Sequence, residues 1–310
     1  MKKSFHILAL FVSVVLIACA GGNSAKKQPE YIPAGMKAIT KGIVKYNQGC
    51  YQHALDYFLK AHELFSASDQ LSGVAISLNN IGNIYRIMGD TKSAVLFLEE
   101  SFKIYTDIGD HKGAVQALSN KTAAMIDSGS LEEAAQDLDA AEDLARKKGI
   151  SYIPLLNNRG VLLTKTKDYV QAEKILKKAL AKTDPADSSA FATVNFALGK
   201  LMLEAQRYEN AIGFLEAALV ADRSTGFYKG IADDLAAIGT VYLNLDNKEA
   251  GVNYLKRSIK VYALIGSVKK VEKILYDLEN ISKTSGYDVS VTLHFVNQWL
   301  EGNALGSLCK

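Results

Sequence analysis

Several residue types are scarce in this chain of 310 residues. It holds four prolines, three cysteines and one tryptophan, and its formal net charge is only +3. Few prolines over such a length favour helices, because proline removes a backbone donor and breaks helix interiors. A nearly neutral chain gives no electrostatic reason to expect nucleic acid as a partner. Because 48% of the residues are hydrophobic, the chain is expected to fold rather than stay disordered.

Motifs that carry catalysis or metal binding are also missing. The chain has no His-Glu-x-x-His run, no phosphate-binding loop and no Gly-x-Ser-x-Gly, and its five histidines do not pair at metal-ligand spacing. We therefore predict a protein that is not an enzyme and that has no cofactor and no metal.

The N-terminal segment has the order of an export signal. Lys2 and Lys3 precede an apolar run from Phe5 to Ile17, which is too short for a comfortable membrane span. The run ends in Leu16-Ile17-Ala18-Cys19, which resembles the bacterial lipobox.

That resemblance implies a bacterial lipoprotein, in which residues 1–18 are removed and the Cys19 thiol carries a diacylglyceryl group. Cleavage would take the net charge from +3 to +1, because Lys2 and Lys3 are lost. Residues 19–33 are small and polar and are expected to form a flexible tether. Ala20 stands where an inner-membrane retention signal would place aspartate. We therefore expect an outer-membrane lipid anchor with the domain on the periplasmic face.

The rest of the chain repeats itself with a period of about 40 residues. Three tracks of residues keep this spacing in register over six units, and they mark a small residue, a second small residue twelve positions earlier, and a large residue four positions after the first. The first track is Ala54, Ala94, Ala134, Ala172, Ala211 and Gly251. The second is Gly42, Gly82, Thr122, Gly160, Gly199 and Gly239, and the third is Phe58, Leu98, Leu138, Leu176, Leu215 and Leu255.

This pattern resembles the tetratricopeptide repeat, which unit two carries as Ile81-Gly82, Tyr85, Ala94 and Leu98. The resemblance implies an all-α superhelical solenoid of about six helix pairs over residues 34–266. Residues 267–310 would form C-terminal capping helices and a tail, with a short helix within 288–300 and Trp299 in the cap. Thr91 and Ser130 are expected to be helix N-caps.

In such arrays the first helix of each unit lines the concave groove, where a partner protein or peptide segment binds. Counting from the glycine track gives the candidate groove residues Asn79, Asn80, Asn83, Arg86, Asn120, Asn157, Asn158 and Lys200. Asparagine amides both donate to and accept from a peptide backbone. The alternative is that these amides bond the end of the neighbouring helix or the neighbouring turn. The expected function is a membrane-anchored scaffold in the cell envelope; the second hypothesis is a periplasmic ligand-binding component associated with a transporter.

Cys50 and Cys309 lie near opposite ends of the array. A disulfide between them would require the ends of the solenoid to meet. We therefore expect two free thiols, with a periplasmic disulfide as the alternative.

Overall fold

A computed structural model describes residues 31–184, 186–301, 303 and 309. Cys19, the signal segment and all but the last three residues of the expected tether lie outside the described residues. Over the described part of the chain there are 14 α-helices and no strands, which confirms the all-α fold class. The first helix begins at Tyr31, so residues 31–33, which were assigned to the tether, are helical.

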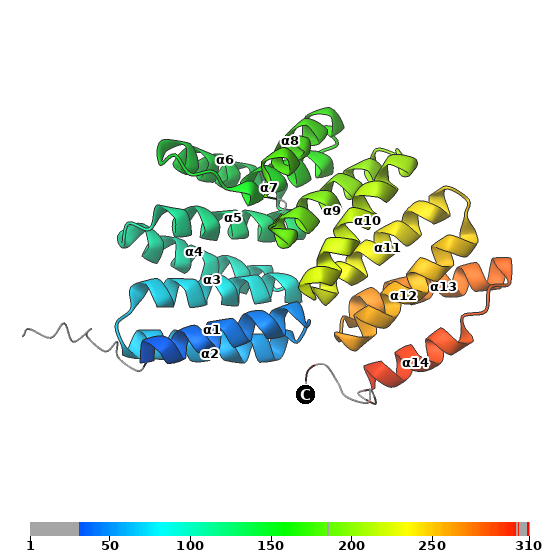
Figure 1. The fold of residues 1–310 in the computed structure, drawn as a ribbon, viewed down its shortest axis with the longest axis horizontal. Coiled ribbons are helices and arrows are strands. Elements are labelled where there is room, and N and C mark those ends of the chain that lie inside the picture. The colour runs from blue at the N-terminus through cyan, green and yellow to red at the C-terminus, as the bar shows by residue number, and fades with distance from the viewer. Residues whose placement is uncertain (1–30, 185, 302, 304–308, 310) are drawn as a thin grey trace, which may run out of the picture.

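The helices follow one another as antiparallel neighbours in a curved stack (Figure 1). The six pairs are α1 (Tyr31–Asn47) with α2 (Tyr51–Ala67), α3 (Leu71–Met88) with α4 (Thr91–Asp107), α5 (His111–Ser128) with α6 (Leu131–Lys147), α7 (Ile153–Lys165) with α8 (Tyr169–Lys182), α9 (Ser188–Glu204) with α10 (Tyr208–Thr225), and α11 (Tyr228–Asn244) with α12 (Lys248–Leu264). Two more helices, α13 (Val268–Ser285) and α14 (Ser290–Leu300), complete the described chain.

The repeating sequence tracks meet in space where the two helices of a pair cross. A Cβ atom on Gly160 would lie 2.3 Å from Leu176 Cγ, and one on Gly199 would lie 2.5 Å from Leu215 Cγ. Both leucines are fully buried. Glycine is needed at these positions because any side chain would push the helices apart. The spacing between the second and third tracks therefore corresponds to the contact between the two helices of a pair.

Helix starts differ from the expectation at one position. Thr91 is the first residue of α4, and the N-cap is Asp90, whose carboxylate accepts a hydrogen bond from the Ser93 backbone N–H at 3.0 Å. The aspartate is the better cap here because its carboxylate reaches the free N–H groups of the first turn. Ser130 does occupy the N-cap of α6, but its side chain makes no capping bond.

The curvature of the stack brings its two ends together. Tyr46 of α1 stacks on Phe227, which precedes α11, with ring centroids 5.8 Å apart and planes inclined by 6°. A Cβ atom on Gly49 would lie 2.6 Å from Ile265 Cβ, so the α1–α2 loop packs against the end of α12. We call this contact the seam: Tyr46 and Gly49 on one side, Phe227 and Ile265 on the other. Figure 1 shows the stack curving back after α8, so that α11 and α12 lie on the same side of the molecule as α1 and α2.

A disulfide joins the same two ends, so the expectation of two free thiols was wrong. Cys50 and Cys309 are bonded, with Cα atoms 5.2 Å apart and a sequence separation of 259. The expectation assumed an open solenoid, whereas the superhelix closes on itself and Cys309 lies against Cys50 in the first repeat.

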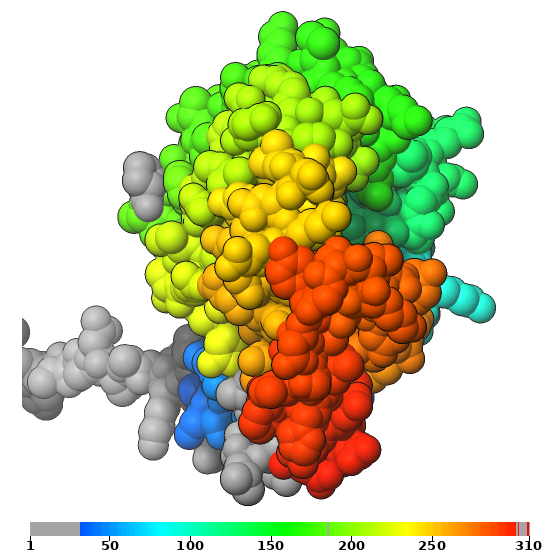
Figure 2. Space-filling model, turned by 90° about the vertical axis from the view of Figure 1, so that its right-hand side faces the viewer, coloured from blue at the N-terminus to red at the C-terminus, as the bar shows by residue number. Residues whose placement is uncertain are grey.

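The last two helices cover the end of the array, as expected. Val296 of α14 is fully buried against the cluster that contains Ile259 and Tyr262 of α12, and Trp299 packs at its edge. Figure 2 shows α13 and α14, in orange and red, lying over this end of the molecule. Trp299 is therefore part of the cap, and the short helix expected within 288–300 is α14.

Candidate binding cavity

The closed superhelix surrounds a cavity of about 960 Å³. Its walls come mainly from the first helix of each pair, α3, α5, α7, α9 and α11, with further residues from the end of α1 and from α8, α10 and α13. Of the eight predicted groove residues, Arg86, Asn157, Asn158 and Lys200 line this cavity. Asn79, Asn80, Asn83 and Asn120 are not among its lining residues.

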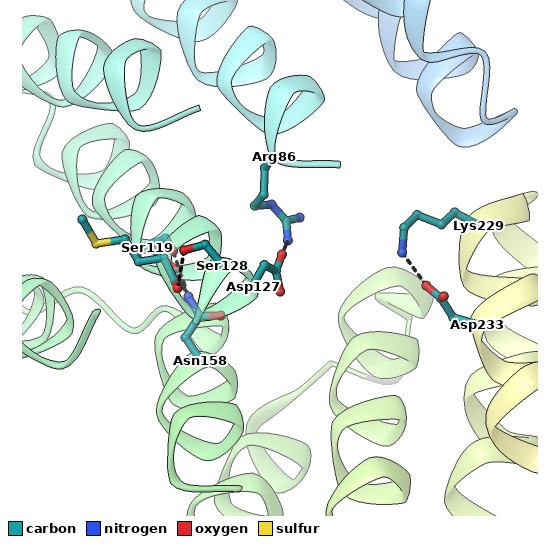
Figure 3. A network of polar contacts seen from close by, with 8 residues as sticks. Arg86, Ser119, Asp127, Ser128, Asn158, Lys229 and Asp233 are labelled. Carbon is teal, nitrogen blue, oxygen red and sulfur yellow. Dashed lines mark hydrogen bonds and ion pairs between the residues drawn. The ribbon is translucent and has the colours of Figure 1, made fainter. Parts of the chain in front are cut away.

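Arg86 contributes a paired charge to the wall. Its guanidinium lies 2.8 Å from the Asp127 carboxylate of α5 (Figure 3). Burial acts to lower the pKa of Arg86, but Asp127 and then Tyr46 outweigh it, and the net shift is upward. The Nε atom is buried without a hydrogen-bond partner. Arg86 thus joins α3 to α5 and keeps one donor unused.

Two of the predicted amides bond between successive repeats. Asn120 donates to the side-chain oxygen of Asn79 at 2.9 Å. Asn158 donates to the backbone oxygen of Ser119 at 2.8 Å and to its hydroxyl oxygen at 3.1 Å (Figure 3). In both cases the donor stands two residues before the glycine-track position of its own unit. The acceptor stands three residues before the glycine-track position of the preceding unit. These amides therefore link the first helices of neighbouring repeats.

Asn80 and Asn83 bond within their own helix. Asn80 donates to the Ile76 carbonyl at 2.9 Å, and Asn83 donates to the Asn79 carbonyl at 3.1 Å. Each of these amide NH₂ groups therefore already has a partner four residues earlier in α3.

Asn157 is where the series of bonds between repeats stops. It stands three residues before Gly160 and is 8% exposed, and its side-chain oxygen is buried without a hydrogen-bond partner. The position that would donate to it in the next unit, two before Gly199, is Ala197, which has no donor. Asn157 therefore presents an open acceptor at the cavity wall. A buried amide oxygen without a partner is costly, so a ligand that donates to it would be favoured.

Lys200 lies further along the same wall, in α9. Its ammonium nitrogen is 3.7 Å from the Glu204 carboxylate, at the long end of an ion pair. Burial lowers the pKa of Lys200, and Lys270 and Lys273 add to the lowering, while Glu204 opposes it. Residues of α13 thus act electrostatically on α9 across the closed superhelix.

A group of carboxylates in α10 and α11 was not foreseen from the sequence. Asp233 lines the cavity, pairs with Lys229 (Figure 3) and accepts a hydrogen bond from the Tyr262 hydroxyl. Asp234 is fully buried, and neither of its side-chain oxygens has a hydrogen-bond partner. The i, i+4 spacing of Lys229 and Asp233 is a readable signal, but nothing in the sequence distinguishes Asp234 from a surface residue.

Burial dominates the ionisation of this group. It raises the pKa of Asp222 to about 7, with Asp233 adding to the shift. It raises the pKa of Asp234 to about 9, with Asp222 adding to the shift. Asp222 also explains Gly230, since a Cβ there would lie 1.7 Å from a carboxylate oxygen of Asp222. At neutral pH, Asp234 is therefore held mainly in its protonated form.

Within the described residues, no group of three or more histidines, cysteines, aspartates or glutamates is placed to hold a metal ion. In the same part of the chain, no helix has the length and apolar character needed to cross a bilayer. The cavity wall itself is lined by both polar and apolar side chains.

Comparison with known proteins agrees with this architecture of paired helices. Family models of the tetratricopeptide repeat match residues 36–107 and 235–263. A Rap protein solved in complex with competence and sporulation factor has 16% sequence identity over 81% of this chain and 75% of its own, with a TM-score of 0.58.

The Rap conjugation gene regulator of the plasmid pLS20, solved in complex with the Phr* peptide, has 14% identity over 94% of this chain and 79% of its own, with a TM-score of 0.58. No curated protein matches the chain in sequence. The chain therefore contains tetratricopeptide repeats and folds as a tetratricopeptide-repeat solenoid.

Proposed function

We propose that this protein is an adaptor that binds an extended segment of a partner protein in its central cavity. The observation that carries the proposal is Asn157, whose buried side-chain oxygen has no partner and which lines the cavity. A peptide N–H is the donor that such an acceptor lacks. The Rap regulator of pLS20, which shares the fold, was solved with a bound peptide, and this supports the proposal.

The size and lining of the cavity define the kind of segment. A volume of about 960 Å³ accommodates a short extended peptide but not a folded domain. Phe196, Tyr169 and Phe227 offer apolar surface for side chains. The lining carries six lysine or arginine side chains and four aspartate or glutamate side chains, so charge alone selects neither a strongly acidic nor a strongly basic segment.

We further propose that the adaptor is a lipoprotein of the bacterial cell envelope, anchored in the outer membrane by Cys19 and facing the periplasm. The lipobox-like residues before Cys19 support this. Several acyl chains on one cysteine would hold a domain firmly, since each buried methylene contributes about 0.8 kcal/mol. In bacterial cells, Cys19→Ser should move the protein from the membrane fraction to the soluble fraction and abolish labelling by radioactive palmitate. An unchanged distribution would refute the anchor.

Photo-cross-linking in bacterial cells tests the binding site. A benzophenone amino acid at Phe196 faces the cavity, and the same amino acid at Val170, which is 79% exposed on α8, is the outer-surface control. We expect Phe196 to capture one recurrent peptide segment that Val170 does not capture. Asn157→Ala should weaken the capture, while Asn80→Ala, whose amide bonds its own helix, should leave it unchanged. Capture from Val170 alone would place the binding site elsewhere.

The second candidate is a ligand-binding component associated with a transporter. The cavity, at about 960 Å³, is also of a size that is typical of small-molecule sites. Native mass spectrometry of the protein purified from cells distinguishes the two. A retained metabolite of fixed mass supports this candidate, and a retained peptide supports the adaptor.

A further inference from the structure

The two ends of the superhelix are held together differently from neighbouring repeats. Successive helices are joined by short loops and pack through alanine and leucine side chains that are fully buried, such as Leu98 in α4 and Leu138 in α6. The seam joins segments that lie far apart in the sequence. Its contacts include the aromatic stack and the loop contact, and the Cys50–Cys309 disulfide lies next to Gly49.

The seam also buries polar atoms that have no partner. The side-chain oxygen of Gln48 and the hydroxyl of Tyr51 are both buried without a hydrogen bond. Burial raises the pKa of Tyr51, with Tyr46 and Asp233 adding to the shift. Buried polar atoms without partners disfavour closure, because they bond water when the surfaces separate. The noncovalent part of the seam is therefore weak compared with the contacts between successive repeats.

The cavity has part of its wall at this contact. Tyr46 and Asn47 line it from one side of the seam, and Phe227 and Lys229 line it from the other. Separation of the two sides would therefore remove part of the wall and open the cavity laterally.

We propose that the Cys50–Cys309 disulfide is a reducible cross-link that keeps the superhelix closed, and that a dithiol reductant opens the cavity at the seam by cleaving it. The two cysteines are 259 residues apart, so the bond links covalently two segments that the chain otherwise connects only through the whole array. Once it is broken, the seam is held by noncovalent contacts. The opening follows from the seam alone, and its consequence for ligand entry rests on the proposed function.

The reaction is a thiol–disulfide exchange. Cys50 is 3% exposed and Cys309 is half-buried, so a thiolate of the reductant attacks Sγ of Cys309. The Cys50–Cys309 bond breaks and Cys50 leaves as a thiolate, which takes up a proton. The second thiol of the reductant then attacks the mixed disulfide and releases Cys309. The protein gains two thiols, and the reductant becomes the disulfide.

Hydrogen exchange measured by mass spectrometry tests the opening without any ligand. The informative amides are those of Gly49, Cys50 and Phe227, which bond the carbonyls of Tyr46, Lys45 and Asp222 next to the seam. Dithiothreitol is added to the folded wild-type protein, and the Cys50→Ser, Cys309→Ser double variant is the matched control. We expect exchange at these amides to be at least tenfold faster after reduction, with α3 to α10 unchanged. The double variant should resemble the reduced protein in both buffers.

Three results would overturn the proposal. Unchanged protection at the seam after reduction would show that the noncovalent contact suffices. A uniform loss of protection over α3 to α10 would show that the disulfide supports the whole fold. An unchanged radius of gyration in small-angle X-ray scattering would show that the ends do not separate.

The two proposals fail separately. Faster exchange at the seam, with no capture from Phe196 in either redox state, would refute peptide binding and keep the reducible closure. Capture from Phe196 with unchanged exchange would do the opposite.

Discussion

Two glycines, each inside a helix, should respond oppositely to the same substitution. Gly160 of α7 lies on the repeated glycine track, and a Cβ there would stand 2.3 Å from Cγ and 2.4 Å from Cδ2 of Leu176. Gly213 of α10 is exposed, and a Cβ there would meet nothing within 4 Å. Alanine substitutions at these two positions therefore distinguish the effect of helix propensity on stability from the effect of the contact between paired helices.

The magnitudes follow from these surroundings. Leu176 is fully buried and cannot move without displacing its neighbours, so overpacking at Gly160→Ala should cost about 1–3 kcal/mol. The better helix propensity of alanine returns about 1 kcal/mol, which leaves a net loss of stability. Gly213→Ala has only the propensity gain and should stabilise the protein by about 0.5–1 kcal/mol. We expect the two variants to differ by about 2 kcal/mol.

Urea unfolding followed by far-ultraviolet circular dichroism measures this difference. The midpoint should move to lower urea for Gly160→Ala and to higher urea for Gly213→Ala, with similar slopes. If Gly160→Ala is as stable as Gly213→Ala, the helices do not cross at the glycine track and the packing described here is wrong.

Three further predictions concern buried and capping polar groups. Burial, with Asp222 adding to it, raises the pKa of Asp234 from 3.8 to about 9. Between these values the folded protein binds the proton more tightly than the unfolded chain, so stability should fall as pH rises from about 5 to 8. The loss from this group is at most about 1.4 kcal/mol per pH unit. Asp234→Asn should flatten that dependence in urea unfolding measured at several pH values, and an unchanged slope would contradict the assignment. Asp187 accepts a hydrogen bond from the Ala190 backbone N–H at 3.0 Å, so Asp187→Ala should lower the thermal unfolding midpoint through a loss of about 1 kcal/mol. Ser130→Ala, at an N-cap whose side chain makes no capping bond, should not lower the midpoint, and equal effects would refute this. Ala197→Asn should stabilise the protein in urea by about 1 kcal/mol, because the new amide would donate to the open side-chain oxygen of Asn157 in the preceding repeat. The same substitution should weaken capture in the cavity. A loss of stability would refute the proposed register of amide bonds between successive repeats.

The pairing of helices was predictable because each contact between paired helices requires particular residue types at a fixed spacing in the sequence. Gly199 and Leu215 are sixteen residues apart and touch, and the same spacing returns in the other units. A close helix crossing requires a small residue opposite a large one, so this pair of residues recurs in each repeat unit. Family models matching 36–107 and 235–263 agree with that interpretation.

The closure of the superhelix was not predictable in the same way. Curvature accumulates from a small rotation at each repeat, and no single residue encodes it. The sequence therefore favours two free thiols, whereas in the folded chain Cys50 and Cys309 are bonded.

The candidate site shows the same limit. Counting from the glycine track placed Asn157 and Lys200 at the cavity, but it could not tell which amides were already bonded. Asn158 lines the cavity while its amide donates to Ser119 of the preceding repeat, and that bond depends on the relative rotation of two units. Asp234 was missed because an aspartate in a helix normally lies on the surface.

Peptide mapping under non-reducing conditions tests most directly whether the array closes on itself. The protein is purified from an oxidising compartment with free thiols blocked, digested and analysed by mass spectrometry. A closed superhelix predicts an intramolecular Cys50–Cys309 peptide from the monomer. Blocked thiols at both cysteines, or a cross-link found only between two chains, would contradict it.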